Sequence, residues 1–164
     1  MSIGRYWVIV NKYRLQSLAF HVAIGVIAKF VPAAFTAYFI AFIAYAVIRI
    51  VKSADKSMLA ARYVLYAAGL EIVYRVSGYT VVYELGKYAC SLLLLIGIVA
   101  NGRSSDARPF LFYFMLLVPA IALVPMDEGI EAFRRTVMFS LSGPIVLALS
   151  GMYFYGRLLS EERL

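Results

Sequence analysis

Residues 40–48 have the sequence Ile-Ala-Phe-Ile-Ala-Tyr-Ala-Val-Ile, and residues 91–99 have the sequence Ser-Leu-Leu-Leu-Leu-Ile-Gly-Ile-Val. Neither stretch shows the alternation of apolar and polar residues that a membrane-spanning β-strand requires. Within a bilayer, only helices and closed barrels satisfy their backbone polar groups internally. The two stretches therefore predict an all-α membrane protein.

The composition of the whole chain supports this interpretation. Of its 164 residues, 63% are hydrophobic and 15% are charged, and the mean hydropathy is +0.83. An ordinary soluble domain is about half apolar and about a quarter charged. The charged residues also occur in short clusters between long apolar runs, so the composition excludes a soluble globular domain.

The number of spans follows from the thickness of the bilayer. A hydrocarbon core of about 30 Å takes about 20 helical residues, so about six spans fit into the chain. The apolar runs place them at residues 15–30, 33–50, 58–74, 82–100, 109–124 and 136–155. We expect one transmembrane helical domain at residues 15–156, a polytopic bundle, between cytoplasmic segments at residues 1–14 and 157–164. Because the last segment stops within a charged stretch, we also expect the chain to be truncated.

The junction between the first two runs has two interpretations. The first run ends at Lys29-Phe30-Val31-Pro32, where proline favours a break between helices. A tight hairpin of two spans is the expected arrangement, and one long helix kinked at the proline is the alternative.

Basic residues indicate the orientation of a six-span chain. With the N-terminus in the cytoplasm, eleven Lys and Arg residues fall inside and five fall outside. Cytoplasmic loops carry the excess of positive charge, so both termini are expected in the cytoplasm. The net charge of +7 thus reports topology rather than a nucleic-acid partner. Tyrosines at the ends of runs, such as Tyr74 and Tyr153, are expected to anchor at the headgroups.

Residues with metal-binding or redox chemistry are few. Cys90 is the only cysteine, and His21 is the only histidine. No Cys/His cluster has the spacing of a metal site, so neither a metal nor a cofactor is expected. We expect His21 to be a buried, hydrogen-bonded residue of the first span.

Seven charged residues lie beside the apolar runs on the predicted outer face. Glu71 and Arg75 are four residues apart, Glu84 and Lys87 are three apart, and Glu131 lies one turn before Arg134 and Arg135. The acids can simply neutralise neighbouring bases at the headgroup boundary. Alternatively, the loop edges converge into a cleft for a lipid-linked phosphate or pyrophosphate, with Arg75, Lys87, Arg134 and Arg135 as donors.

Ser142-Gly143-Pro144 lies inside the last apolar run. Proline removes a backbone hydrogen bond and glycine loosens the helix, so we expect a break or kink here. An opened turn would present backbone amides to an anion, whereas the alternative is close packing of helices.

Three strings together resemble bacterial O-antigen ligase and polymerase-like membrane proteins, in the N-terminal half of that family. They are Gly-Leu-Glu-Ile-Val-Tyr-Arg at residues 69–75, Val-Tyr-Glu-Leu-Gly-Lys-Tyr at residues 82–88 and Phe-Arg-Arg-Thr-Val-Met-Phe-Ser-Leu-Ser-Gly-Pro at residues 133–144. The resemblance covers about residues 59–157. The matching positions are Glu71, Arg75, Tyr83, Glu84, Gly86, Lys87, Arg134, Arg135, Ser142, Gly143 and Pro144.

The resemblance implies a multi-pass glycosyltransferase of the bacterial inner (plasma) membrane that serves the synthesis of cell-envelope polysaccharide. Its partners would be membrane lipid and a glycan linked to undecaprenyl pyrophosphate, with no nucleotide sugar, metal or other cofactor. The basic residues would hold the pyrophosphate, and Glu71 or Glu84 would orient donor or acceptor. The family's second half carries a large outer loop with functional Arg and His residues, so the chain is not expected to act alone.

A different class of function fits the same sequence. A small non-catalytic membrane protein, such as a transporter subunit or an assembly partner, would use its charged loops only for topology or docking. An ion or proton pathway fits less well, because it requires ionisable groups near the bilayer midplane, and Glu71, Glu84 and Lys87 lie near the ends of runs.

Overall fold

The computed structural model describes residues 3–76, 84–102, 108–122 and 129–161, and these residues contain helices and no strands. The all-α prediction is therefore confirmed for this part of the chain. The helices are α1 (Ile3–Phe30), α2 (Pro32–Ser53), α3 (Leu59–Val76), α4 (Leu85–Asn101), α5 (Arg108–Ala122) and α6 (Ile130–Glu161).

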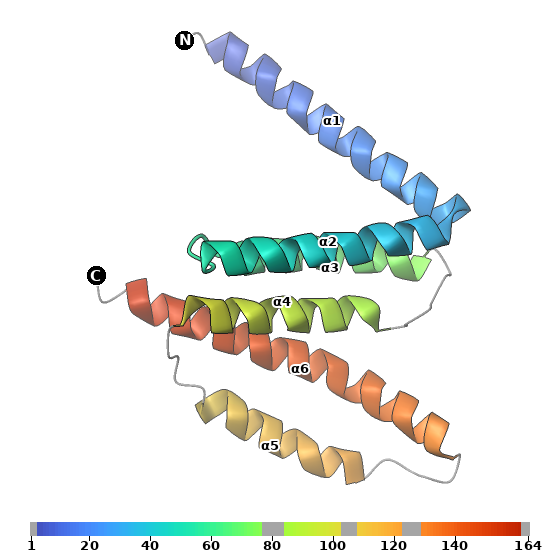
Figure 1. Cartoon of the computed structure of the whole chain (residues 1–164), viewed down its shortest axis with the longest axis vertical. Coiled ribbons are helices and arrows are strands. Elements are labelled where there is room, and N and C mark those ends of the chain that lie inside the picture. The colour runs from blue at the N-terminus through green and yellow to red at the C-terminus, as the bar shows by residue number, and fades with distance from the viewer. Residues whose placement is uncertain (1–2, 77–83, 103–107, 123–128, 162–164) are drawn as a thin grey trace.

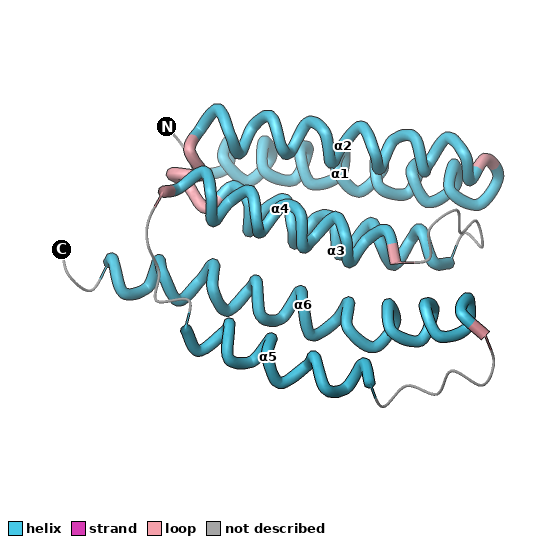
Figure 2. Tube along the Cα trace, turned by 60° about the horizontal axis from the view of Figure 1, so that its bottom comes forward, coloured by secondary structure: helices cyan, strands magenta, loops and turns pink. Residues whose placement is uncertain are grey.

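Successive helices run up and down, so they begin alternately at two ends of the molecule (Figures 1 and 2). Helices α3 and α5 begin at one end, and helices α2, α4 and α6 begin at the other. Helices α3 and α4 form the centre; α2 packs against both, and α6 packs against α4. Helix α5 contacts only α6 among the described helices, and α1 contacts only α2 and α3.

Two helices in the described part of the chain are long and apolar enough to cross a membrane. They are Pro32–Ser53 of α2 and the segment Ile130–Tyr155 of α6. Shorter apolar helices cover Leu15–Phe30, Leu85–Asn101 and Arg108–Pro119. Helix α3 carries Arg62, Glu71 and Arg75 within 18 residues, which lowers its apolar character. By length and composition the helices support membrane association, and six spans stay a prediction.

Two helices extend beyond the apolar runs from which they were predicted. Helix α1 begins at Ile3 rather than at residue 15, and α6 ends at Glu161 rather than at residue 155. The apolar run measures only the part suited to a bilayer core, whereas the helix continues wherever backbone hydrogen bonds continue. With 28 residues, α1 is about 42 Å long.

The junction of α1 and α2 is a sharp turn at Val31. This residue leaves the helical region with φ −137° and ψ 69°, and Pro32 is the first residue of α2. A proline fits the first helical position because the backbone N–H that it lacks has no intrahelical partner there. The expected turn between two helices is confirmed and the single kinked helix is wrong. The two helices nevertheless diverge from the turn, as Figure 1 shows.

The α2–α3 turn directs the side chain of Asp55 toward the interior of the molecule. Ala54, Asp55 and Met58 have positive φ, and the Ala54 and Asp55 N–H groups donate to the last carbonyls of α2. Asp55 is buried; its Oδ1 accepts a hydrogen bond from the Ala60 N–H at 2.8 Å, and its Oδ2 accepts one from the Tyr153 hydroxyl at 2.8 Å. The turn is thereby connected to α6.

Helix α4 leaves room for that connection at Gly97. A Cβ atom on this glycine would lie 2.6 Å from Ala60 Cβ and 2.8 Å from Tyr153 Cε2, distances at which atoms overlap.

Two tyrosines at the ends of the apolar runs are buried. Tyr74 packs against Phe35 and Phe39 and is fully buried, and Tyr153 is almost fully buried. The expected headgroup anchoring of Tyr74 and Tyr153 is therefore wrong, because aromatic rings at helix ends also fill the space between helices.

Candidate functional site

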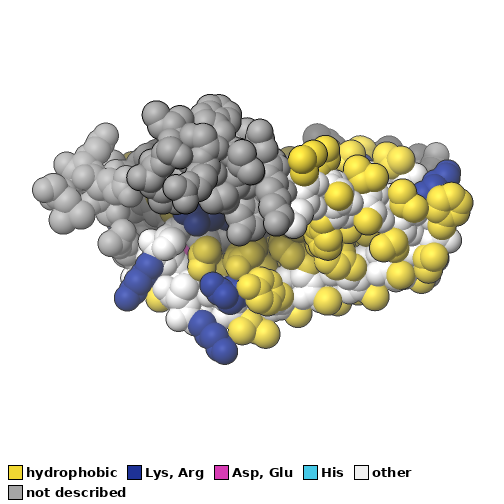
Figure 3. Space-filling model, turned by 90° about the horizontal axis from the view of Figure 1, so that it is seen from above, with side chains coloured by type: hydrophobic (Ala, Val, Ile, Leu, Met, Phe, Trp, Pro, Cys, Tyr) yellow, Lys and Arg dark blue, Asp and Glu magenta, His cyan; other side chains and the backbone are white. Residues whose placement is uncertain are grey.

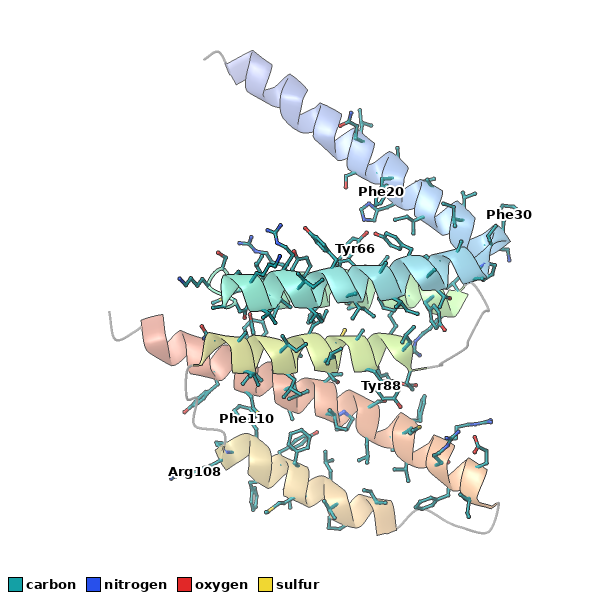
Figure 4. The ribbon with its side chains drawn as sticks, viewed as in Figure 1. Phe20, Phe30, Tyr66, Tyr88, Arg108 and Phe110 are labelled. Carbon is teal, nitrogen blue, oxygen red and sulfur yellow. The ribbon has the colours of Figure 1, made fainter. Side chains whose placement is uncertain are left out.

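Side chains of α3, α4 and α6 meet at the end of the molecule where α3 ends and α4 begins. We call this group the charged cluster; it consists of Glu71, Arg75, Glu84, Lys87 and Ser142. Figure 4 marks this end of α4 by Tyr88, the residue next to Lys87. Residues more than 50 positions apart in the sequence are thus joined through side-chain polar groups.

The first contact of the cluster lies within α3. The Arg75 guanidinium donates to Glu71 Oε1 from Nε at 2.9 Å and from Nη2 at 2.5 Å. Both side chains are half-buried, and the same Nη2 lies 4.0 Å from Glu84 Oε1. Charge-assisted contacts of this kind hold the guanidinium at the junction of α3 and α4.

The second contact joins α4 to α6. Lys87 Nζ lies 2.7 Å from Glu84 Oε2 and donates to Ser142 Oγ at 3.0 Å. The Ser142 hydroxyl donates in turn to Glu84 Oε2 at 3.0 Å. Lys87 Nζ also lies 5.0 Å from the centre of the Phe139 ring, a cation–π distance. One ammonium group is therefore held by a carboxylate, a hydroxyl and a ring.

A glycine allows α3 and α4 to approach at the cluster. A Cβ atom on Gly86 would lie 2.6 Å from Glu71 Cδ and equally close to the rest of that side chain. Because the overlap includes Glu71 Cβ, rotation of the side chain alone would not relieve it. Gly86 therefore creates the space that the Glu71 side chain occupies.

One atom of the charged cluster has no hydrogen bond to the described residues. Glu84 is 5% exposed, and its Oε1 has no hydrogen-bond partner there. A buried acceptor without a donor costs about 1–3 kcal/mol. Glu84 Oε1 is therefore an acceptor to which an incoming hydroxyl or N–H group could donate.

The two arginines of α6 lie apart from the buried contacts. Arg134 Nη2 donates to Glu131 Oε1 at 2.7 Å, and both side chains are more than 60% exposed. Arg135 is exposed and forms no ion pair with a described carboxylate. The predicted convergence of seven charged residues is thus only partial, because four are packed together and three remain on the surface.

Helix geometry nevertheless connects Arg135 with the charged cluster. Arg135, Phe139 and Ser142 are spaced four and three residues apart, so they share one face of α6. Exposure falls along this face, from the exposed Arg135 through Phe139, 57% exposed, to the buried Ser142. Arg135 lies about 10 Å along the axis from Ser142. It is nearer the start of α6, the end that projects past the start of α4 in Figure 1.

The prediction at Ser142, Gly143 and Pro144 was a break or a kink; a break is wrong, and a kink stays a prediction. Helix α6 is continuous from Ile130 to Glu161, with Pro144 inside it. A proline removes one donor and leaves the other hydrogen bonds in place, and packing against α4 holds the helix together. The amides of this turn are therefore not opened to an anion, whereas the Ser142 side chain belongs to the cluster.

Other expectations have separate outcomes. His21 is hydrogen-bonded as expected, with Nδ1 2.6 Å from the Ser17 carbonyl, but it is exposed rather than buried because α1 diverges from the other helices. Cys90 is a free, buried cysteine. Tyr83 lies outside the described residues. Within the described ranges, no group of three or more His, Cys, Asp or Glu residues could hold a metal ion.

Comparison with protein-family models, with curated proteins and with solved structures finds no match for this chain. The candidate site therefore rests on the geometry of these side chains.

Proposed function

We propose that the chain is a membrane part of an O-antigen ligase or polymerase-like glycosyltransferase, as a six-span bundle of the bacterial inner membrane with both termini in the cytoplasm. The observation that carries the proposal is the charged cluster, where a carboxylate with an unfilled oxygen lies between two basic side chains at the end of α3 and the start of α4, beside α6. In that topology this end, with the start of α6, would lie on the outer side, because successive helices run in alternating directions.

Apolar side chains on the surface support the membrane setting. Leu65 on α3, Met115 on α5 and Leu147 on α6 are each at least 66% exposed. Exposed apolar side chains on several helices are costly in water and favourable in lipid. They belong to the long sides of the helices, whereas the charged cluster lies near one end.

The donor would be a glycan on undecaprenyl pyrophosphate. Arg134 and Arg135 would receive the pyrophosphate, because exposed guanidinium groups can grip phosphate oxygens in pairs. Arg75 and Lys87 would approach it from the buried side and stabilise the charge that builds on the departing group. Arg135 is the first candidate, since it faces the cluster and forms no described ion pair.

The transfer itself would replace one bond to the anomeric carbon by another. A hydroxyl of the acceptor attacks that carbon, the bond to the pyrophosphate oxygen breaks, and the pyrophosphate leaves with the electron pair. Glu84 Oε1 would accept first the hydrogen bond and then the proton of the acceptor hydroxyl, and Glu71 would hold Arg75 in place. No metal or cofactor is required for this arrangement.

Binding of the carrier tests the proposal with the chain alone. The purified chain in uncharged detergent is titrated with undecaprenyl pyrophosphate and, separately, with undecaprenol. We expect preference for the pyrophosphate and an affinity at least about tenfold lower in the double variant Arg134→Gln/Arg135→Gln, since each charged hydrogen bond contributes about 1.5–3 kcal/mol.

The matched control removes two cations from the first half of α1, which belong to neither the charged cluster nor the start of α6. The variant Lys12→Gln/Arg14→Gln has the same change in charge and should keep its affinity for undecaprenyl pyrophosphate. Equal binding of undecaprenol and undecaprenyl pyrophosphate, or equal losses in both double variants, would contradict a site at the start of α6.

A second candidate function is a non-catalytic membrane subunit or assembly partner. The observation in its favour is that Glu71, Glu84 and Glu131 each pair with a base on the same helix or beside it. Such pairs can fix topology and packing without a ligand. The swapped variant Glu71→Arg/Arg75→Glu should keep partner assembly under this candidate, whereas it should abolish glycan transfer in membranes under the first.

A further inference from the structure

The opposite end of the molecule carries a second group of charges, which we call the basic patch. Its residues come from the last turns of α2, the α2–α3 turn and the first turn of α3, and all four are exposed: Arg49, Lys52, Lys56 and Arg62. Figure 3 shows Lys and Arg side chains gathered at one end of this face and hydrophobic side chains over much of the remainder.

The basic patch is not neutralised by an acid in its own segment. Between residues 49 and 62 the only acid is Asp55, whose carboxylate is turned inward to Tyr153 and the Ala60 N–H. No member of the patch forms an ion pair with a described carboxylate. The fold therefore buries the acid and leaves four cations facing outward.

Aromatic rings lie directly beside these cations. The Arg49 guanidinium carbon is 5.9 Å from the centre of the Tyr45 ring, and Arg49 Nη1 donates to the Tyr45 hydroxyl at 3.4 Å. The Tyr45 and Tyr63 rings meet edge to face at 6.2 Å. Tyrosine rings with an apolar body and a polar tip favour the headgroup level of a membrane.

Exposed apolar side chains continue from the patch along α2. Ile48 and Val51 are 52% and 56% exposed, next to Arg49 and Lys52 in the sequence. A soluble anion would need the cations alone, whereas a lipid has a phosphate for the cations and acyl chains for the apolar side chains. The combination favours a lipid.

We infer that the basic patch binds the headgroup of an anionic phospholipid, with the phosphate between Arg49, Arg62 and the α2–α3 turn and the acyl chains along Ile48 and Val51. The inference is independent of the proposed glycosyl transfer, because it uses none of the residues of the charged cluster. The chemistry of recognition is charge complementarity plus apolar contact, so a zwitterionic lipid of the same chain length should bind less well.

The test uses the full chain in uncharged detergent and counts bound lipid by native mass spectrometry. Short-chain phosphatidylglycerol and phosphatidylcholine are added in matched amounts, with and without inorganic phosphate. We expect preference for phosphatidylglycerol, an apparent affinity about tenfold lower in Arg49→Gln/Arg62→Gln, and no displacement by millimolar phosphate. The single variant Lys29→Gln, which removes an exposed cation elsewhere, should stay within about twofold of the unchanged chain.

Each other outcome overturns the inference. Equal retention of the two lipids, or the same loss in Lys29→Gln as in Arg49→Gln/Arg62→Gln, would show a general charge effect. Displacement by inorganic phosphate would identify a site for the free anion. If Arg49→Gln/Arg62→Gln does not fold by circular dichroism, Lys52→Gln/Lys56→Gln takes its place, and unchanged phosphatidylglycerol binding in that variant contradicts the patch.

Discussion

At one end of the molecule Arg75 and Lys87 are held by Glu71 and Glu84, whereas at the other end no member of the basic patch forms an ion pair with a described carboxylate. This difference in pairing arises from the directions of the carboxylate side chains at the two ends. Glu71 and Glu84 face their basic neighbours between helices, and Asp55 is turned away from its neighbours toward Tyr153. Paired charges can be buried and join helices, whereas unpaired cations stay on the surface and are available to an anion.

The largest expected effect tests whether the charged cluster joins α4 to α6. In Lys87→Met the buried Glu84 carboxylate loses its ammonium partner, and breaking a buried pair in this way costs about 3–5 kcal/mol. The free energy of unfolding in mixed detergent micelles measures the loss. The double variant Glu84→Gln/Lys87→Met removes both charges and should recover part of it, and equal stabilities of the single and double variants would contradict a coupled pair.

A methyl group tests the close approach of α3 and α4. Gly86→Ala places a Cβ within the space of Glu71, so we expect a loss of about 1–3 kcal/mol in unfolding free energy. Gly69→Ala is the matched control, because nothing lies within 4 Å of its added Cβ and alanine favours a helix by about 0.5–1 kcal/mol. Opposite signs for the two variants are expected, and a gain in both would show that Gly86 is not at a tight contact.

At the opposite end, the buried acid can be tested through its partner. Tyr153→Phe removes the hydroxyl that donates to Asp55 Oδ2, and a buried acceptor that loses its donor costs about 1–3 kcal/mol. Tyr155→Phe, at a 40% exposed ring on the same helix, should change the unfolding free energy by less than about 0.5 kcal/mol. An equal loss of unfolding free energy in both variants would contradict a stabilising hydrogen bond from Tyr153 to Asp55.

The smallest expected effect is at the exposed pair of α6. Arg134→Gln breaks a contact between two side chains that are largely exposed, so stability should change by about 0.2–1 kcal/mol. The same denaturation measurement checks this value. A loss of several kcal/mol would mean that Arg134 is a structural residue, and its substitution could no longer report on a ligand.

The sequence predicted the helices better than the contacts between them. Long apolar runs such as residues 91–99 determine helix content and approximate position, because burial in lipid or between helices favours the same residues. The four-residue spacing of Glu71 and Arg75 within one helix also predicted the ion pair that these two residues form. Spacing along the chain predicts no more than this, since no local pattern links Ser142 to Lys87 or Tyr153 to Asp55, which are brought together only by packing.

Two errors have a common physical origin. Local propensity favours Tyr74 and Tyr153 at the headgroups and a break or kink of α6 at Pro144. Packing against neighbouring helices overrides the propensity in both cases, by burying the rings and by keeping the helix continuous around the proline. Gly86 and Gly97, singly placed glycines, mark the close contacts that could have indicated which helices meet.

The most direct measurement of the central claim is photo-crosslinking with a polyprenyl pyrophosphate that carries a diazirine beside its phosphates. Label is located by mass spectrometry of peptides from the full chain in membranes. The account predicts labelling of residues 71–87 and 130–142, suppressed by excess undecaprenyl pyrophosphate and not by undecaprenol. Labelling concentrated at residues 49–62, or unaffected by the pyrophosphate competitor, would contradict it.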